Sequence, residues 1–160
     1  EDYCSAQADT FYSTLWFYNT CGTLLAMSLG TWDPGLASTN AESLLSADTL
    51  DRLIGYDREN KLHQLDELLS TDEQQRLAAL MKVDHDAWRG VAEPLADAAV
   101  IHLLRFFAVA ENLPGWEAGA QSPVIPLARI LRKRGARLDK PMLQWLREVN
   151  DNRFLPYGPL

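Results

Sequence analysis

"PLADAAVIHLLRFFAVA", residues 94–110, is the stretch that decides the fold. Its polar side chains after the opening proline are only Asp97, His102 and Arg105, so a helix built from it is apolar on nearly every face. A helix that is apolar all round is buried inside a protein rather than laid on its surface. The sequence therefore predicts a central helix near 94–111 with neighbours on most sides, and Pro94 suits its first turn.

The flanking segments carry the start and stop signals of further helices. Ser46 precedes a short helix ending at Gly55, and leucines recur at helical spacing through 57–69. A later start is predicted at Ser70 with Glu73 or at Thr71 with Gln74. Another is predicted at Ser122 before "PVIPLARILRKRG", where the regular helix begins at Pro123 or at Pro126 and closes at Gly135, and a last one at Asp139 before "KPMLQWLREV". We predict an all-α fold: one compact domain over 1–160, with six or seven helices and an irregular tail, 150–160, docked on its body.

A second long uncharged stretch, "TFYSTLWFYNTCGTLLAMSLGTW", occupies residues 10–32. A membrane span needs about 20 mostly apolar residues, whereas 10 of these 23 are Ser, Thr, Asn or Gly. No Lys or Arg flanks the stretch to set an orientation. We interpret it as a largely buried helix and predict no membrane span.

Composition indicates an ordinary globular protein, with 47% hydrophobic and 23% charged residues. The formal charge of −7 opposes nonspecific binding to nucleic acid or anionic lipid. Two cysteines, Cys4 and Cys21, are too few for a disulfide scaffold and fit no metal-binding spacing. With no visible signal peptide, a cytoplasmic protein is expected.

Catalytic motifs are absent from the sequence. It contains no phosphate-binding G-x-x-x-x-G-K-S/T, no G-x-G-x-x-G, no G-x-S-x-G, no H-E-x-x-H and no C-x-x-C. This favours a protein that is not an enzyme, and we predict no cofactor.

One set of residues nevertheless has the composition of a metal site. Glu59, His63 and Glu67 are spaced i, i+4, i+8, so on one helix they would present O, N and O ligands along one face. His102 is a further candidate ligand. The alternative is a solvated helix face, because the Glu-x-x-His spacing of di-iron bundles does not occur.

The two basic groups of the apolar helix call for internal partners. A histidine among apolar residues is usually hydrogen-bonded to backbone or a carboxylate, and we expect this of His102. For Arg105 we expect an ion pair with Asp97 or Glu111.

Charge is distributed unevenly along the chain. Residues 1–100 hold 17 acidic and 6 basic side chains, whereas residues 101–160 hold 5 acidic and 9 basic ones. Six of the basic residues fall between 129 and 140: Arg129, Arg132, Lys133, Arg134, Arg137 and Lys140. Such a cluster suits phosphate groups, RNA or an acidic partner. The structural alternatives are that the cations stabilise the C-terminus of a helix, by about 0.3–1 kcal/mol each at most, or that they pair with the protein's own acidic half.

Aromatic residues supply the last candidates. Trp116 lies in the loop "LPGWEAG", and Phe154 and Tyr157 lie in the tail "RFLPYGPL". Aromatic side chains dominate the hot spots of protein interfaces. We therefore predict one partner-binding surface, composed of Trp116, Arg129, Arg132, Lys133, Arg134, Arg137, Phe154 and Tyr157.

These observations favour a non-catalytic acidic protein that binds a macromolecular partner, as an adaptor, assembly factor or regulator. A protein partner is expected, and nucleic acid is disfavoured. Two alternatives stay open. One is a metal- or cofactor-dependent helical-bundle enzyme that uses Glu59, His63, Glu67 and His102. The other is an acidic nucleic-acid mimic that uses the carboxylates of 42–97 against a basic protein.

Overall fold

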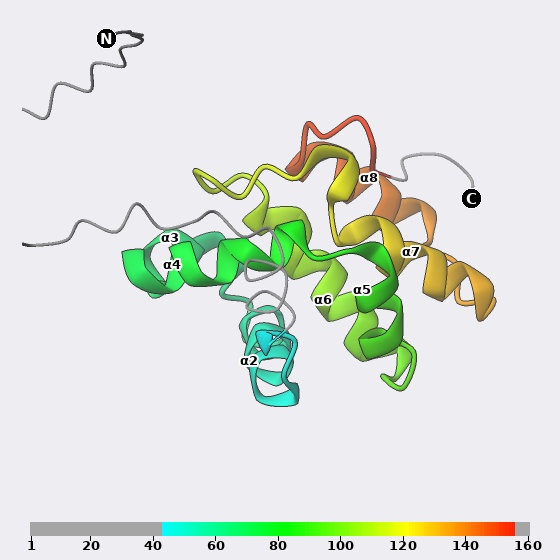
Figure 1. The fold of residues 1–160 in the computed structure, drawn as a ribbon. Coiled ribbons are helices and arrows are strands. Elements are labelled where there is room, and N and C mark those ends of the chain that lie inside the picture. The colour runs from blue at the N-terminus through cyan, green and yellow to red at the C-terminus, as the bar shows by residue number, and fades with distance from the viewer. Residues whose placement is uncertain (1–42, 156–160) are drawn as a thin grey trace, which may run out of the picture. The chain divides into compact units, whose positions relative to one another are not determined.

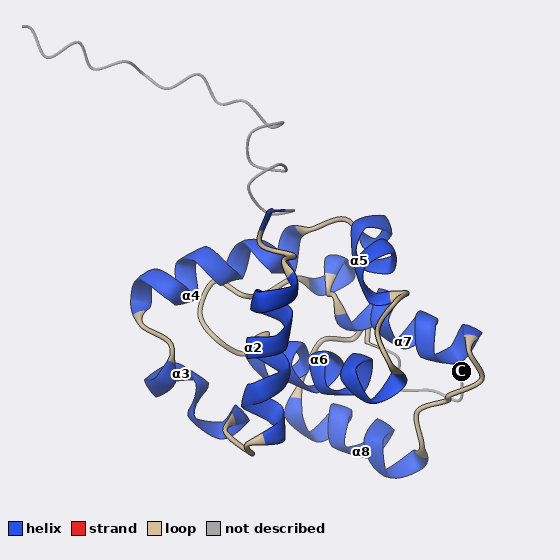
Figure 2. Cartoon of the chain, turned by 90° about the horizontal axis from the view of Figure 1, so that it is seen from below, coloured by secondary structure: helices blue, strands red, loops and turns tan. Residues whose placement is uncertain are grey.

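The computed structural model describes residues 43–155, and these contain helices and no strand (Figures 1 and 2). The α-helices are α2 (Ala47–Arg58), α3 (Leu65–Leu68), α4 (Thr71–Ala78), α5 (His85–Ala92), α6 (Asp97–Ala110), α7 (Val124–Lys133) and α8 (Lys140–Val149). Three 3₁₀ turns, η1 (Leu62–Gln64), η2 (Ala79–Lys82) and η3 (Gly119–Gln121), link them. The all-α prediction is confirmed. The predicted helix over 10–32, both cysteines and Tyr157 lie outside the described residues.

Helix α6 is the central element, as the apolar stretch predicts. It packs against α2, α7, α8 and η1, and α5 packs on α7 (Figure 2). Half of its 14 residues are buried: Val100, Leu103, Leu104, Phe106, Phe107, Ala108 and Ala110. Within the described part of the chain, no helix has the length and apolarity that crossing a bilayer requires.

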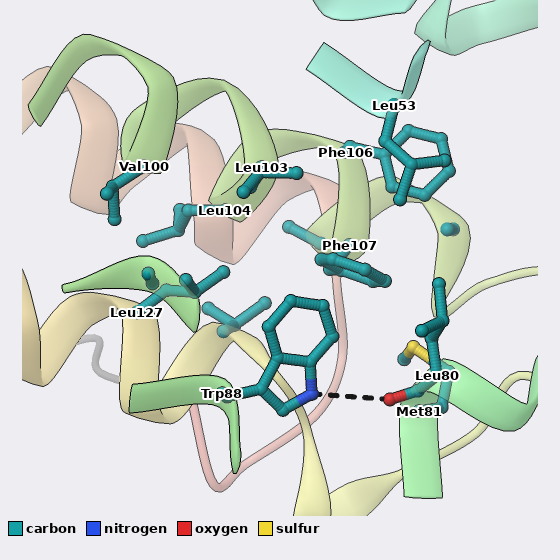
Figure 3. Close-up of a cluster of buried hydrophobic side chains, with 14 of the residues drawn as sticks. Leu53, Leu80, Met81, Trp88, Val100, Leu103, Leu104, Phe106, Phe107 and Leu127 are labelled. Carbon is teal, nitrogen blue, oxygen red and sulfur yellow. Dashed lines mark hydrogen bonds between the residues drawn. The ribbon is translucent and has the colours of Figure 1, made fainter. Parts of the chain in front are cut away.

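An aromatic cluster fills the space beside α6 (Figure 3). The Trp88 ring of α5 meets Phe107 edge-on at 5.0 Å between centroids, and Phe107 meets Phe106 at 5.2 Å. The indole N–H of Trp88 donates to the Leu80 carbonyl oxygen at 3.3 Å, so the buried ring leaves no polar atom unpaired. Full burial of each such ring contributes roughly 2–3 kcal/mol.

Side-chain caps begin several of the helices, and three of them are confirmed predictions. Ser46 accepts from Thr49 N–H, Ser70 from Glu73 N–H, and Asp139 from Met142 N–H. Each cap satisfies a backbone donor that has no partner within the helix. Partial desolvation raises the pKa of Glu73, but the Arg52 guanidinium and hydrogen bonds at Ser70 outweigh it and lower that pKa below its ordinary value.

The predicted end of the first helix, at Gly55, is wrong. Helix α2 runs through Gly55 to Arg58 and closes in a Schellman motif, with Asn60 in the left-handed region at φ 56°. The motif's two hydrogen bonds run from Lys61 N–H to Tyr56 O and from Asn60 N–H to Asp57 O. Asparagine tolerates this conformation better than other non-glycine residues. The turn ends the helix there and separates Glu59 from the leucines that follow.

The predicted starts at Pro94 and Ser122 also need correction. Helix α6 begins at Asp97 because Ala96 is extended, and exposed Pro94 belongs to the turn after α5. The Ser122 hydroxyl does not cap α7, because it donates instead to Glu111 Oε2 at 3.1 Å. The end of α7 follows the prediction, with Gly135 in the left-handed region at φ 81°.

The buried carboxylate of Glu111 holds together the end of α6, the loop before α7 and the tail. Its Oε1 accepts from Asn152 Nδ2 at 2.6 Å and from two backbone N–H groups, those of Ala118 and Gly119. Its Oε2 accepts from Ser122 and from Asn150 Nδ2. Five neutral donors thus replace the water that the carboxylate lost on burial.

We expect Glu111→Gln to lower the free energy of unfolding by about 2 kcal/mol or more, because the amide group would face donors and leave them unpaired. Urea denaturation followed by far-UV circular dichroism measures this. Glu117→Gln, at an exposed position of the same loop, is the control and should stay within about 0.5 kcal/mol of wild type. Equal stability of the two variants would contradict the role given to Glu111.

Candidate functional site

The basic residues of 129–140 surround the C-terminal end of α7. Arg129, Arg132 and Lys133 project from the exposed side of the helix, opposite a buried face. That face consists of Val124, Pro126, Leu127, Ala128, Ile130 and Leu131. Because residues three and four apart are neighbours on a helix, the three cations form one patch.

Arg134 differs from its neighbours because its guanidinium is bound within the protein. It donates to the carbonyl oxygens of Ala92, Glu93 and Leu95, at 3.1, 2.6 and 2.8 Å, and to Asp97 Oδ1 at 2.7 Å. Its side chain is only 24% exposed. These carbonyls follow the end of α5, where a helix leaves acceptors without intrahelical partners. Arg134 therefore joins α7 to the turn between α5 and α6, and it is a structural residue.

The remaining cations face solvent and form the candidate site, which we call the basic end: Arg129, Arg132, Lys133, Arg137 and Lys140. Lys133 approaches Glu93 at 3.4 Å, but both side chains are largely exposed. Within residues 43–155, no ion pair engages any of the other four. Exposed charges of this kind contribute little to stability, so they are available to a partner.

The prediction that Trp116 belongs to a partner-binding surface is wrong. Its side chain is fully buried, and its ring lies 6.3 Å from that of Phe106. The loop folds back over the core, which gives the indole a core position. Phe154 is 49% exposed and therefore accessible, and Tyr157 lies outside the described residues.

The predicted composite surface is divided between the two ends of α6. Arg134 binds Asp97 at the first residue of α6, whereas Asn152 of the tail binds Glu111, which follows its last. A 14-residue helix is about 20 Å long. Residues 150–155 and the end of α7 are accordingly well separated in Figure 1. The basic end and the described part of the tail, which contains Phe154, are therefore distinct places on the molecule.

The predicted metal ligands do not converge. Because α2 ends at Arg58, Glu59, His63 and Glu67 lie on three different local structures instead of one helix face. Glu59 pairs with Lys61 at 2.5 Å, and all three candidates are exposed. Among the described residues, no three His, Cys, Asp or Glu side chains are placed to hold a metal ion.

His102 has a carboxylate partner, as the sequence predicts. The same carboxylate, Asp57 of α2, is also the partner of Arg105, for which Asp97 or Glu111 was predicted. Asp57 of α2, whose side chain is 1% exposed, places Oδ2 at 2.7 Å from His102 Nδ1 and Oδ1 at 3.3 Å from Arg105 Nε. A carboxylate only accepts hydrogen bonds, so His102 donates through Nδ1. The prediction of Asp97 or Glu111 for Arg105 is wrong, since those carboxylates are occupied by Arg134 and by the loop and tail.

Asp57 was missed as a site residue, although the sequence contains a signal for it. It continues the apolar stripe of α2, in which Leu50, Leu53 and Ile54 are buried. A carboxylate at such a position must find a cation or donors inside the protein. The sequence does not show which ones, because His102 lies 45 residues away.

A cleft of about 330 Å³ opens beside this cluster. Val109 of α6, with Trp145 and Val149 of α8, gives it an apolar wall. Asp57 and Arg105 line it as well. The Arg105 guanidinium lies over the Trp145 ring, 5.0 Å from its centroid.

The chain matches no protein-family model, no curated protein and no solved structure. The functional argument accordingly comes from the geometry of the basic end and of the cleft.

We expect Arg134→Ala to lower the free energy of unfolding by about 2 kcal/mol, because it removes charge-assisted hydrogen bonds and leaves three carbonyls without their donor. Arg132→Ala, two residues away on the exposed side, should change it by no more than about 0.5 kcal/mol. Urea denaturation compares the two variants. Equal effects would contradict the division between Arg134 and the basic end.

Proposed function

We propose that this protein is a non-catalytic binding protein, an adaptor, assembly factor or regulator, that takes an acidic segment of a partner protein on its basic end. The proposal rests on the exposure of Arg129, Arg132 and Arg137 and on their lack of ion-pair partners among the described residues. Arginine presents a planar fork of donors that matches a carboxylate.

The basic end stands on a rigid support, which favours specific binding. The buried face of α7 packs against α6 and α5, and Arg134 ties its last turn to Leu95 and Asp97. A binding surface that is already ordered loses less conformational entropy when a partner arrives. The spacing of Arg129 and Arg132, one helical turn apart, suits two acidic groups of an extended or helical segment.

The charge balance supports a protein partner over nucleic acid. Residues 129–140 hold six basic side chains and one acidic one, whereas the whole chain carries −7. A local cationic patch steers a short acidic segment toward itself, while the overall negative field opposes a long polyanion such as nucleic acid, whose charges extend beyond the patch. With only two cysteines in the sequence, a reducing compartment suits the chain, and we include the cytoplasm in the proposal.

The two alternative functions have less support. The enzyme hypothesis required Glu59, His63 and Glu67 on one face, and α2 ends before that face is built. The mimic hypothesis required free carboxylates in the acidic half. Three of these are held within the protein: Asp57 is buried against His102, Glu73 pairs with Arg52, and Asp97 pairs with Arg134.

The test compares two triple alanine variants for binding to a fluorescein-labelled 12-residue Glu/Asp-rich peptide, measured by anisotropy at 50 and 300 mM NaCl. R129A/R132A/R137A should weaken binding about tenfold at the lower salt, since each exposed pair contributes up to about 1 kcal/mol. The difference in affinity between wild type and this variant should be smaller at 300 mM NaCl, because salt screening already weakens peptide binding to the wild type.

The matched control R58A/R76A/K82A removes the same charge from exposed positions on α2, α4 and η2. It should bind the peptide within about twofold of wild type. An equal loss in both triple variants would show a response to net charge alone and would contradict the proposal. Tighter binding of a 20-nucleotide single-stranded DNA than of the peptide would contradict the choice of a protein partner.

A further inference from the structure

The cleft between α2, α6 and α8 is independent of the basic end and has the composition of a small-ligand site. Its volume of about 330 Å³ falls at the lower limit of ligand pockets in proteins. Such pockets combine an apolar lining with a few converging polar groups. Here Val109, Trp145 and Val149 supply the apolar wall, and Arg105 and Asn60 supply polar groups.

Arg105 is the group that selects the ligand. Its Nε forms an ion pair with Asp57 Oδ1 at 3.3 Å without a hydrogen bond, and its Cζ lies over the Trp145 ring. No hydrogen bond or ion pair to another described residue engages its two terminal nitrogens, and its side chain is 34% exposed. A guanidinium that is ion-paired through Nε and lies over an indole keeps its two terminal nitrogens available as a fork of donors. That geometry is complementary to a planar carboxylate.

The charge of the cleft favours an anion with one negative charge. Arg105 is the sole Lys or Arg among the cleft's lining residues, and buried Asp57 already offsets it. Beside this ion pair a phosphate dianion would add two uncompensated negative charges in a partly desolvated site, whereas a carboxylate adds one, and the Arg105 terminal nitrogens can donate to both of its oxygens.

We propose that this cleft binds a small organic acid that has one carboxylate and an apolar body. Arg105 takes the carboxylate, and the body packs on the wall formed by Trp145, Val109 and Val149. Asp57 is a positioning residue: its Oδ1 pairs with Arg105 Nε at 3.3 Å, and its second oxygen remains bound to His102.

The experiment titrates the full-length ¹⁵N-labelled protein with benzoate, phenylacetate and hexanoate, and follows the indole N–H signals by NMR. The Trp145 signal is assigned by its loss in Trp145→Phe. At least one of the acids should move this signal with a saturable curve below 10 mM. Benzamide, which has the shape of benzoate without its charge, should bind at least tenfold more weakly. Inorganic phosphate should leave the signal in place.

Two variants test the site separately. Arg105→Gln should weaken binding of the acid at least tenfold because it removes the charge-assisted fork. Val109→Phe fills the cleft and should abolish binding, and it keeps the proposal testable if Arg105→Gln fails to fold. Val91→Phe makes the same enlargement at a half-buried position of α5 and should bind as wild type does.

The proposal is overturned if none of the three acids moves the Trp145 signal, or if Val109→Phe binds as tightly as Val91→Phe. Equal affinity for benzamide and benzoate would overturn the role of Arg105, and saturable binding of phosphate would replace the carboxylate with a phosphate ligand. None of these outcomes bears on the peptide affinity of the basic end, so the two proposals fail independently.

Discussion

The burial of α6 is the constraint on which the other helices depend. Its apolar side chains face several directions, so it reaches a stable position only when α2, α7 and α8 cover it together. Each covering helix contributes one apolar face and leaves its polar face to solvent. The aromatic cluster of Trp88, Phe106 and Phe107 then fills the space where α5 and α6 meet. The positions of the surrounding helices therefore follow from the need to bury α6.

Buried polar side chains determine how the surrounding helices align with α6. Arg105 and His102 on α6 need a carboxylate, and Asp57 supplies it only if α2 crosses α6 at the right turn. Glu111 needs donors, and the loop and tail supply five. Because an unpaired buried charge or donor costs more than a satisfied one contributes, these contacts exclude misaligned packings.

The two proposed sites use arginine in two different ways. At the basic end, the guanidinium groups are exposed and unengaged within the described residues, so they act as charges toward a large partner. In the cleft, Arg105 is held in place and serves as a directional donor to a small one. Arg134 shows a third use, since it binds three carbonyls and a carboxylate and contributes only to structure. One residue type therefore has three roles, and its neighbours in space decide among them.

The sequence by itself determined the class of fold, the central position of 94–111, the caps at Ser46, Ser70 and Asp139, and the turn at Gly135. These features depend on residues within one or two helical turns of each other, so local periodicity and hydrogen bonding are enough to predict them. Only the tertiary structure decided that Asp57 is the partner of Arg105, that Arg134 is bound internally and that Trp116 is buried. Those outcomes depend on which distant segments become neighbours, with separations of about 40 residues for Arg134 and 45 for Asp57 and His102. No local pattern records such a pairing, because it arises only when the helices pack.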